Sequence, residues 1–288
     1  MSLPPGPRYI PSKTVEEFIY AVLEGPPLEW RLLILQGSRS EGNTTGVIMA
    51  CAAVAEELRA KGFTEFPLIV AFVRDTWENL KRTSLAAFKE NRTKGMPIEI
   101  FDGGKQATFG SPDSPAVHFW FFGLDQAADA DKLQGFTCGI LVLEEVAPAA
   151  GLATGVPPEA LGIGATSVRQ AGVPKRILVP MNPPDEDHWI LKVEKHLADQ
   201  SLDFIKVKRF EMEPGEKSRH FEHLAAMTEG EEANQWALAA DEFDAYRAAN
   251  QAFLESIGRG DLVQRLVGGQ VGFAQMGEAV IPNFSKAL

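Results

Sequence analysis

Cysteine is scarce in this sequence: only Cys51 and Cys138 occur among 288 residues. Two cysteines cannot form the framework of a small disulfide-rich domain, so we expect buried, reduced thiols of the kind found in cytosolic proteins. Long apolar runs are missing too. The longest include residues 32–35 and 140–143, far short of the roughly 20 residues that span a bilayer. The first residues also lack the features of a secretory signal. We therefore expect a soluble, cytoplasmic protein with no membrane partner.

Positive charge is in short supply as well, because the net charge at pH 7 is −11. This balance argues against a protein that coats nucleic acid, since phosphate binding needs clustered Lys and Arg, but it leaves room for a local basic patch. With 45% hydrophobic and 23% charged residues, the composition excludes a disordered tail, a collagen-like repeat and a coiled coil. A chain of this length can bury a full core.

Short apolar runs alternate with amphipathic segments along the first 200 residues. The runs of strand length are residues 30–35, 67–73, 98–101, 117–122, 140–143 and 177–180. Helical spacing marks residues 14–23, 47–61, 77–90 and 192–200. This alternation predicts an α/β fold with a mostly parallel central sheet covered by helices on both faces.

Strand signals fade after residue 200. Residues 204–210 allow one more strand, residues 213–218 have the composition of a polar loop, and residues 231–257 are acidic and Ala-rich with helical spacing. We therefore predict an α/β core over residues 1–200 and a small helical subdomain over residues 201–288.

A loop of small and polar residues follows the first apolar run. Its residues are Gly37, Ser38, Arg39, Ser40, Glu41, Gly42, Asn43, Thr44 and Thr45. The two glycines lie five apart and Thr44 follows two positions later, which matches the phosphate loop of P-loop NTPases except that Asn43 stands where Lys is expected. In such a loop backbone N–H groups and a helix N-terminus bind phosphates, and the Thr hydroxyl binds Mg²⁺. Arg39 is the obvious replacement for the missing lysine. The alternative is a Gly/Ser-rich turn with no ligand.

Two carboxylates follow the apolar run at residues 140–143. Glu144 and Glu145 stand where the Walker B acids of a P-loop NTPase stand: one carboxylate binds the Mg²⁺ shell and the next activates the attacking water. The alternative is a strand that ends in two solvated acids. The order of loop and acids along the chain strengthens the first interpretation.

Two further strand ends carry polar residues. Asn182 follows the run at residues 177–180 and could sense the γ-phosphate, although Asn182 with Pro183 and Pro184 can equally be a turn. Arg74 ends the run at residues 67–73 and could stabilise transition-state charge on the same or a neighbouring subunit. A surface ion pair with Asp75 or Glu78 is the alternative for Arg74.

Over residues 30–285 the sequence resembles the ATPase domain of a tailed-bacteriophage large terminase. The resemblance is carried by the loop at residues 37–44, residues 73–76 and 80–81, residues 133–135 leading into 141–145, and Asn182-Pro183 with His188-Trp189. It implies a motor that hydrolyses ATP with Mg²⁺ and drives double-stranded DNA into a capsid. Implied partners are double-stranded DNA, the capsid portal, the small terminase subunit and further copies of the chain in a ring, all in the host cell cytoplasm.

The resemblance also implies roles for single residues. Glu145 would be the catalytic base, and Glu144 and Thr44 would bind the metal ion. Arg39 would be the arginine of the phosphate loop. Asn182 would couple hydrolysis to movement. Residues 201–288 would form a lid or linker that leads to an absent nuclease domain, so DNA cutting is not expected. Two alternatives remain open: a degenerate P-loop scaffold that binds DNA or portal without turnover, for which Asn43 is the best support, and another P-loop motor such as a helicase.

Overall fold

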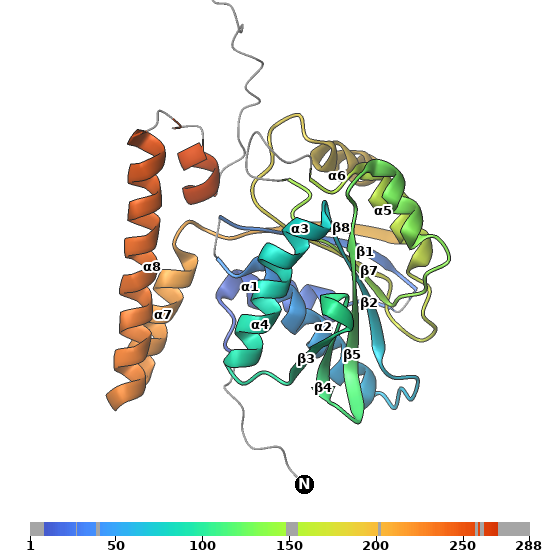
Figure 1. The fold of residues 1–288 in the computed structure, drawn as a ribbon, viewed down its shortest axis with the longest axis horizontal. Helices are drawn as coiled ribbons and strands as arrows, with labels where there is room; N and C mark the ends of the chain where they lie inside the picture. The colour runs from blue at the N-terminus through green and yellow to red at the C-terminus, as the bar shows by residue number, and fades with distance from the viewer. Residues whose placement is uncertain are drawn as a thin grey trace, which may run out of the picture.

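The computed structural model describes residues 9–26, 28–38, 41–147, 155–200, 203–256, 259 and 262–269. In these residues a single eight-stranded sheet forms the centre, with the strand order β3-β4-β5-β2-β6-β7-β1-β8 (Figure 1). Six neighbouring strands, from β5 to β8, run parallel, whereas β3 and β4 are antiparallel additions at one edge. The strands are β1 (Trp30–Gln36), β2 (Leu68–Arg74), β3 (Ile98–Phe101), β4 (Gln106–Ser111), β5 (Ser114–Gly123), β6 (Ile140–Leu143), β7 (Arg176–Met181) and β8 (Ile205–Glu211).

Helices cover both faces of the sheet. The helical elements are α1 (Lys13–Leu23), α2 (Asn43–Ala60), α3 (Trp77–Asn79), the π-helix η1 (Leu80–Ser84), α4 (Leu85–Thr93), the 3₁₀ turns η2 (Asp102–Gly104) and η3 (Ala127–Leu133), α5 (Pro158–Ser167), α6 (Trp189–Asp199), α7 (Glu216–Met227), α8 (Gly230–Ser256) and the π-helix η4 (Val263–Val267). Helices α1, α2 and α4 pack on one face, and η3, α5 and α6 on the other. The predicted fold class is confirmed.

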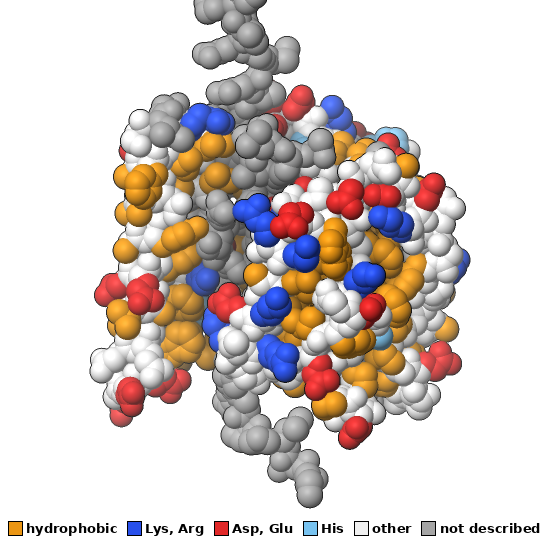
Figure 2. All heavy atoms as spheres, viewed as in Figure 1, with side chains coloured by type: hydrophobic (Ala, Val, Ile, Leu, Met, Phe, Trp, Pro, Cys, Tyr) orange, Lys and Arg blue, Asp and Glu red, His pale blue; other side chains and the backbone are white. Residues whose placement is uncertain are grey.

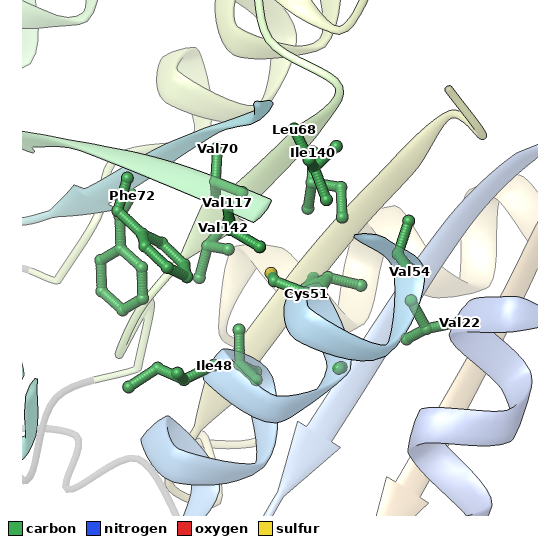
Figure 3. Packing of buried hydrophobic residues seen from close by; sticks show 14 of the residues in the cluster. Val22, Ile48, Cys51, Val54, Leu68, Val70, Phe72, Val117, Ile140 and Val142 are labelled. Carbon is green, nitrogen blue, oxygen red and sulfur yellow. The ribbon is translucent and has the colours of Figure 1, made fainter. Parts of the chain in front are cut away.

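Two apolar layers hold the sheet between these helices, because side chains alternate between the faces of a strand. On β2, Val70 and Phe72 enter the layer under α2, whereas Ala71 and Val73 enter the opposite layer. Figure 3 shows Cys51 of α2 among the residues of the first layer. Cys51 and Cys138 are both buried and free, as expected.

The structure corrects several predicted boundaries. Helix α2 begins at Asn43, inside the predicted loop, because Gly42 adopts the left-handed conformation that starts the helix. The predicted helix over residues 77–90 is divided into α3, η1 and α4. Strand β4 and helix α5 were not predicted: β4 has only two apolar side chains, Ala107 and Phe109, and α5 is rich in glycine and alanine with a weak apolar face.

Helices α7 and α8 form an antiparallel hairpin beside the α/β core (Figure 1). Phe221 of α7 stacks on Trp236 of α8 with 5.6 Å between ring centroids. Helix α7 begins at Glu216, within the predicted polar loop, because Gly215 starts a helix there with a left-handed backbone. Strand β8 lies beyond the predicted boundary at residue 200 and pairs with β1, so the sheet itself extends to Glu211. No helix in the described part of the chain is long and apolar enough to cross a bilayer.

Candidate functional site

The carboxyl ends of four parallel strands meet at one edge of the sheet. Strands β2, β6, β7 and β1 are consecutive neighbours, so the residues that follow them lie close together. The edge therefore collects Gly37 after β1, Arg74 at the end of β2, Glu144 and Glu145 after β6, and Asn182 after β7. These are residues that the sequence singled out from four separate segments.

The loop after β1 is held close to β7 and to the start of α2. The Gly37 N–H donates to the Met181 carbonyl at 3.2 Å. A Cβ at Gly37 would lie 2.7 Å from Asn43 Oδ1, so this position accepts only glycine without a shift. As a glycine N-cap, Gly42 offers no side chain to the first N–H groups of α2, and such groups bind phosphate in loops of this kind.

The side chains of the first turn of α2 each have a different partner. Thr44 Oγ1 donates to Glu144 Oε1 at 2.5 Å. Thr45 Oγ1 accepts from Asn91 Nδ2 at 3.1 Å. Asn43 Nδ2 donates to the Met181 carbonyl at 3.1 Å, while its Oδ1 is buried with no hydrogen-bond partner in the described residues. Asn43, in the lysine position of the motif, thus ties the helix to β7.

Arg74 joins both carboxylates. Its guanidinium donates to Glu144 at 3.1 Å, to Glu145 at 2.5 Å and to Asp75 at 3.2 Å. Burial alone would lower the pKa of Arg74, but the charges of Glu144, Glu145 and Asp75 together raise it. The ion pair with Asp75 that the sequence allowed is therefore present, but it is buried rather than on the surface, and Arg74 pairs with Glu144 and Glu145 as well.

The two acids differ in environment. Glu144 is 2% exposed and also accepts from the Ser84 hydroxyl. The side chain of Glu145 is 34% exposed, so it can reach a solvent molecule. Glu145 has a left-handed backbone, with φ 50°, which is uncommon for a residue other than glycine. Its N–H donates to the Pro180 carbonyl at 2.8 Å, which holds this conformation against β7.

The remaining residues predicted for the site lie in several places. Asn182 is buried directly after β7. His188 caps α6 by accepting from Ile190 N, and its Nε2 lies 3.1 Å from the Val146 carbonyl, so it packs this segment against the end of β6. Ser38 and Glu41 are buried and bond to each other. Arg39 and Ser40 lie outside the described residues.

Oxygen donors at the edge fit a Mg²⁺ ion. Mg²⁺ prefers oxygen ligands and usually keeps bonds to water and to substrate phosphates. The Thr44 hydroxyl and the Glu144 carboxylate, which meet at 2.5 Å, are donors of this kind. Within the described residues no group of three or more His, Cys, Asp or Glu side chains is arranged to hold a metal.

Comparison with solved structures gives a match for the fold. The large terminase of a thermophilic bacteriophage superposes with a TM-score of 0.51 and 15% sequence identity, over 78% of this chain and 52% of that one. The chain has the fold of a phage large terminase. The terminase of the same thermophilic phage in complex with ADP matches with a TM-score of 0.48 and 16% sequence identity, over 77% of this chain and 51% of that one. The HK97 bacteriophage large terminase matches with a TM-score of 0.44 and 17% sequence identity, over 94% of this chain and 51% of that one.

The chain spans about half the length of these terminases. No protein-family profile and no curated protein matches the sequence.

Three polar residues that were not predicted for the site form hydrogen bonds to residues at this edge of the sheet. Ser84 donates to Glu144, Asn91 donates to Thr45, and Asn79 donates to Asp75 at 2.8 Å. Ser84 and Asn91 share the buried side of the η1–α4 segment with Leu80 and Phe88. Polar residues on an otherwise apolar helix side were the available signal, but the π-helical turn that aims Ser84 at Glu144 has no signature in the sequence.

Proposed function

We propose that this chain is the ATP-hydrolysing part of a DNA-packaging motor and acts with Mg²⁺ on ATP. The observation that best supports the proposal is the hydrogen bond between Thr44, at the start of α2, and Glu144, which follows β6. Glu145 is the next residue in the chain. A phosphate-binding helix N-terminus, a hydroxyl and two acids at one sheet edge are the parts that phosphoryl transfer needs. The terminase fold supports the same activity.

Each residue of the site would have its own role in ATP hydrolysis. The N–H groups at the start of α2 and the backbone N–H groups of the loop at residues 37–45 would bind the phosphates, whereas the Glu41 side chain points to α7. Thr44 and Glu144 would hold Mg²⁺, which when bound neutralises phosphate charge. Glu145, more exposed than Glu144, would orient the attacking water and accept its proton. Asn182 would sense the nucleotide from the end of β7, and Arg39 would add positive charge from the loop.

Arg74 has to change partners for this chemistry. A carboxylate that is bonded to a guanidinium at 2.5 Å is a weak base, because the cation stabilises its charged form. We infer that the negative γ-phosphate attracts Arg74 away from Glu145, so that the guanidinium faces the phosphate while Glu145 faces the water.

The test is Mg²⁺-dependent ATP turnover at high protein concentration, comparing the wild type with Glu145→Gln. Turnover that is lost in E145Q while nucleotide binding is kept supports the proposal. The matched control is Glu159→Gln, which changes an exposed acid of α5 and should leave turnover intact.

A degenerate scaffold without turnover is the second candidate. Asn43 in place of lysine and the neutralising contacts of Arg74 favour it. If the wild type neither binds Mg-ATP nor turns it over, the scaffold is the better explanation. Binding without turnover would point to a missing neighbour in a ring. Another P-loop motor, such as a helicase, is the enzymatic alternative, and stimulation by capsid portal rather than by single-stranded DNA would exclude it.

Partners are part of the same proposal: double-stranded DNA, the capsid portal, the small terminase subunit and other copies of the chain, in the host cell cytoplasm. Support for DNA comes from a basic surface on η1, on α4 and at the residue after α4, made of the exposed residues Lys81, Arg82, Lys89, Arg92 and Lys94. Figure 2 shows Lys and Arg side chains over this part of the molecule. Such clustering stands out in a chain with a net charge of −11 and suits a polyanion.

A further inference from the structure

Glu41 is a carboxylate in the middle of the candidate phosphate loop, yet it is only 4% exposed. An acid in a loop of small polar residues is expected to be solvated. A negative charge at this place would also repel a bound phosphate if it faced the inside of the loop. The burial of Glu41 therefore indicates that other groups of the protein stabilise its carboxylate.

The explanation lies in α7. Glu41 Oε1 accepts from the Gly215 N–H at 3.1 Å, and Oε2 accepts from the Lys217 N–H at 3.1 Å. The Ser38 hydroxyl donates to Oε1, also at 3.1 Å. A carboxylate at a helix N-terminus is stabilised by the unpaired N–H groups and by the helix dipole. The loop thus supplies the cap of α7 from 174 residues away in the sequence.

The second helix of the hairpin also reaches this point. A Cβ at Gly215 would lie 2.4 Å from Arg247 Nη1, so the missing side chain at Gly215 makes room for the guanidinium of α8. Arg247 donates to the Val267 carbonyl at 3.0 Å. Burial raises the pKa of Glu41, whereas its hydrogen bonds to Lys217, Gly215 and Ser38 and the positive charge of Arg247 oppose this shift. Both helices of the hairpin therefore converge on one loop carboxylate.

Another carboxylate attaches the hairpin elsewhere. Glu216 accepts from the backbone and the hydroxyl of Thr14 at 2.9 and 2.7 Å, which ties α7 to α1. His220 lies 3.0 Å from the Ile10 carbonyl. These contacts bypass the phosphate loop, so they provide a control for the effect of Glu41.

We propose that Glu41 is a positioning residue that couples the phosphate loop to the α7–α8 hairpin. This proposal rests on the proposed function, because it requires a phosphate in the loop. The negative phosphate repels the Glu41 carboxylate and so strengthens its bonds to the N-terminus of α7. Nucleotide binding therefore tightens the hairpin onto the core, and release of the phosphate loosens it.

Hydrogen exchange of the amides at residues 215–217 tests the coupling, with and without Mg-ATPγS, in the full chain. In the wild type we expect nucleotide to slow this exchange about tenfold, as for a stronger hydrogen bond to a charged acceptor. In Glu41→Gln, which keeps the shape but not the charge, nucleotide should bind without slowing it. In Glu216→Gln the exchange without nucleotide should be faster, but the slowing by nucleotide should remain.

Separate outcomes identify which proposal fails. Binding of nucleotide by the wild type with no change in exchange at α7 overturns the coupling alone. An E41Q chain that responds to nucleotide like the wild type overturns it too. If the wild type binds no nucleotide in a parallel titration, the proposed function fails and the coupling fails with it. Circular dichroism of each variant excludes unfolding as the cause of a lost response.

Discussion

Arg74 Nη2 lies 2.5 Å from Glu145 Oε2, and Nη1 of the same guanidinium lies 3.1 Å from Glu144 Oε2. One buried cation thus holds two neighbouring acids that would otherwise repel each other. Removing one partner of a buried charge cluster leaves uncompensated charge in a poorly solvated place. The arrangement makes Arg74 a structural requirement of the site as well as a candidate for its chemistry.

Arg74→Gln should therefore destabilise the protein by about 3–5 kcal/mol, measured by urea unfolding. The exposed Arg82→Gln is the matched control and should change the free energy of unfolding by less than about 0.5 kcal/mol. Adding Glu144→Gln to Arg74→Gln should restore part of the loss, because it removes one of the unpaired charges. Equal stability of R74Q and R82Q would contradict this account of the cluster.

Thr44→Ala should raise the Mg²⁺ concentration needed for half-maximal ATP turnover by roughly 10- to 100-fold, because it removes one oxygen donor of the metal site. Thr44→Ser keeps the hydroxyl and should stay close to the wild type. Thr45→Ala changes the adjacent hydroxyl, which accepts from Asn91, and should leave the Mg²⁺ dependence unchanged. Chelation of Mg²⁺ should stop turnover in all of these chains. An unchanged Mg²⁺ dependence in T44A would remove Thr44 from the metal site.

The basic surface predicts a salt-dependent affinity for double-stranded DNA. The triple change Arg82→Gln, Lys89→Gln and Arg92→Gln should weaken binding and reduce the slope of log K against log[salt] by about 3, or about 1 for each lost phosphate contact. Lys192 and Lys195, exposed on α6 over the other face of the sheet, provide the control when changed to Gln. Equal slopes for the two sets would show that the charge of η1 and α4 is not specifically used. Fluorescence anisotropy of a labelled duplex at several salt concentrations measures both.

His118 predicts a pH dependence of stability. Its ring centroid lies 5.6 Å from that of Phe101 and 5.2 Å from that of Trp120, and burial lowers its pKa below the usual 6.5. Between the lowered pKa and 6.5 the unfolded chain binds more protons, so the free energy of unfolding decreases as the pH falls through this window.

His118→Phe keeps an aromatic ring without the titration, so its stability should decrease less than that of the wild type between pH 7.5 and 5.5. His223→Phe, at an exposed position of α7, should keep the wild-type trend. Urea unfolding at the two pH values measures the difference, and parallel behaviour of H118F and the wild type would refute the role of His118.

The sequence was informative where a residue type and its place in an element act together. Glu144 and Glu145 could be placed at a sheet edge because they follow an apolar run, and that edge position follows from any parallel sheet. The direction of a side chain within the edge could not be predicted. Glu41 lies in the predicted phosphate loop, but the direction of its carboxylate toward α7 could not be predicted, because the N–H groups that it binds belong to Gly215 and Lys217, far along the chain. Asn43 illustrates the same limit, since its amide bonds to Met181 on another strand.

The edge strands bear on how the protein behaves at high concentration. Strand β8 carries the exposed Lys206 and Lys208, and β3 at the opposite edge is only four residues long. Lysines on an edge strand oppose the addition of a further strand by electrostatic repulsion and solvation, and a short edge offers few backbone bonds. The sheet is thereby protected against edge-to-edge aggregation, so the concentrated samples that a turnover assay needs should stay in solution. Contacts between copies would then have to form through side-chain surfaces, where their strength can respond to salt and to nucleotide.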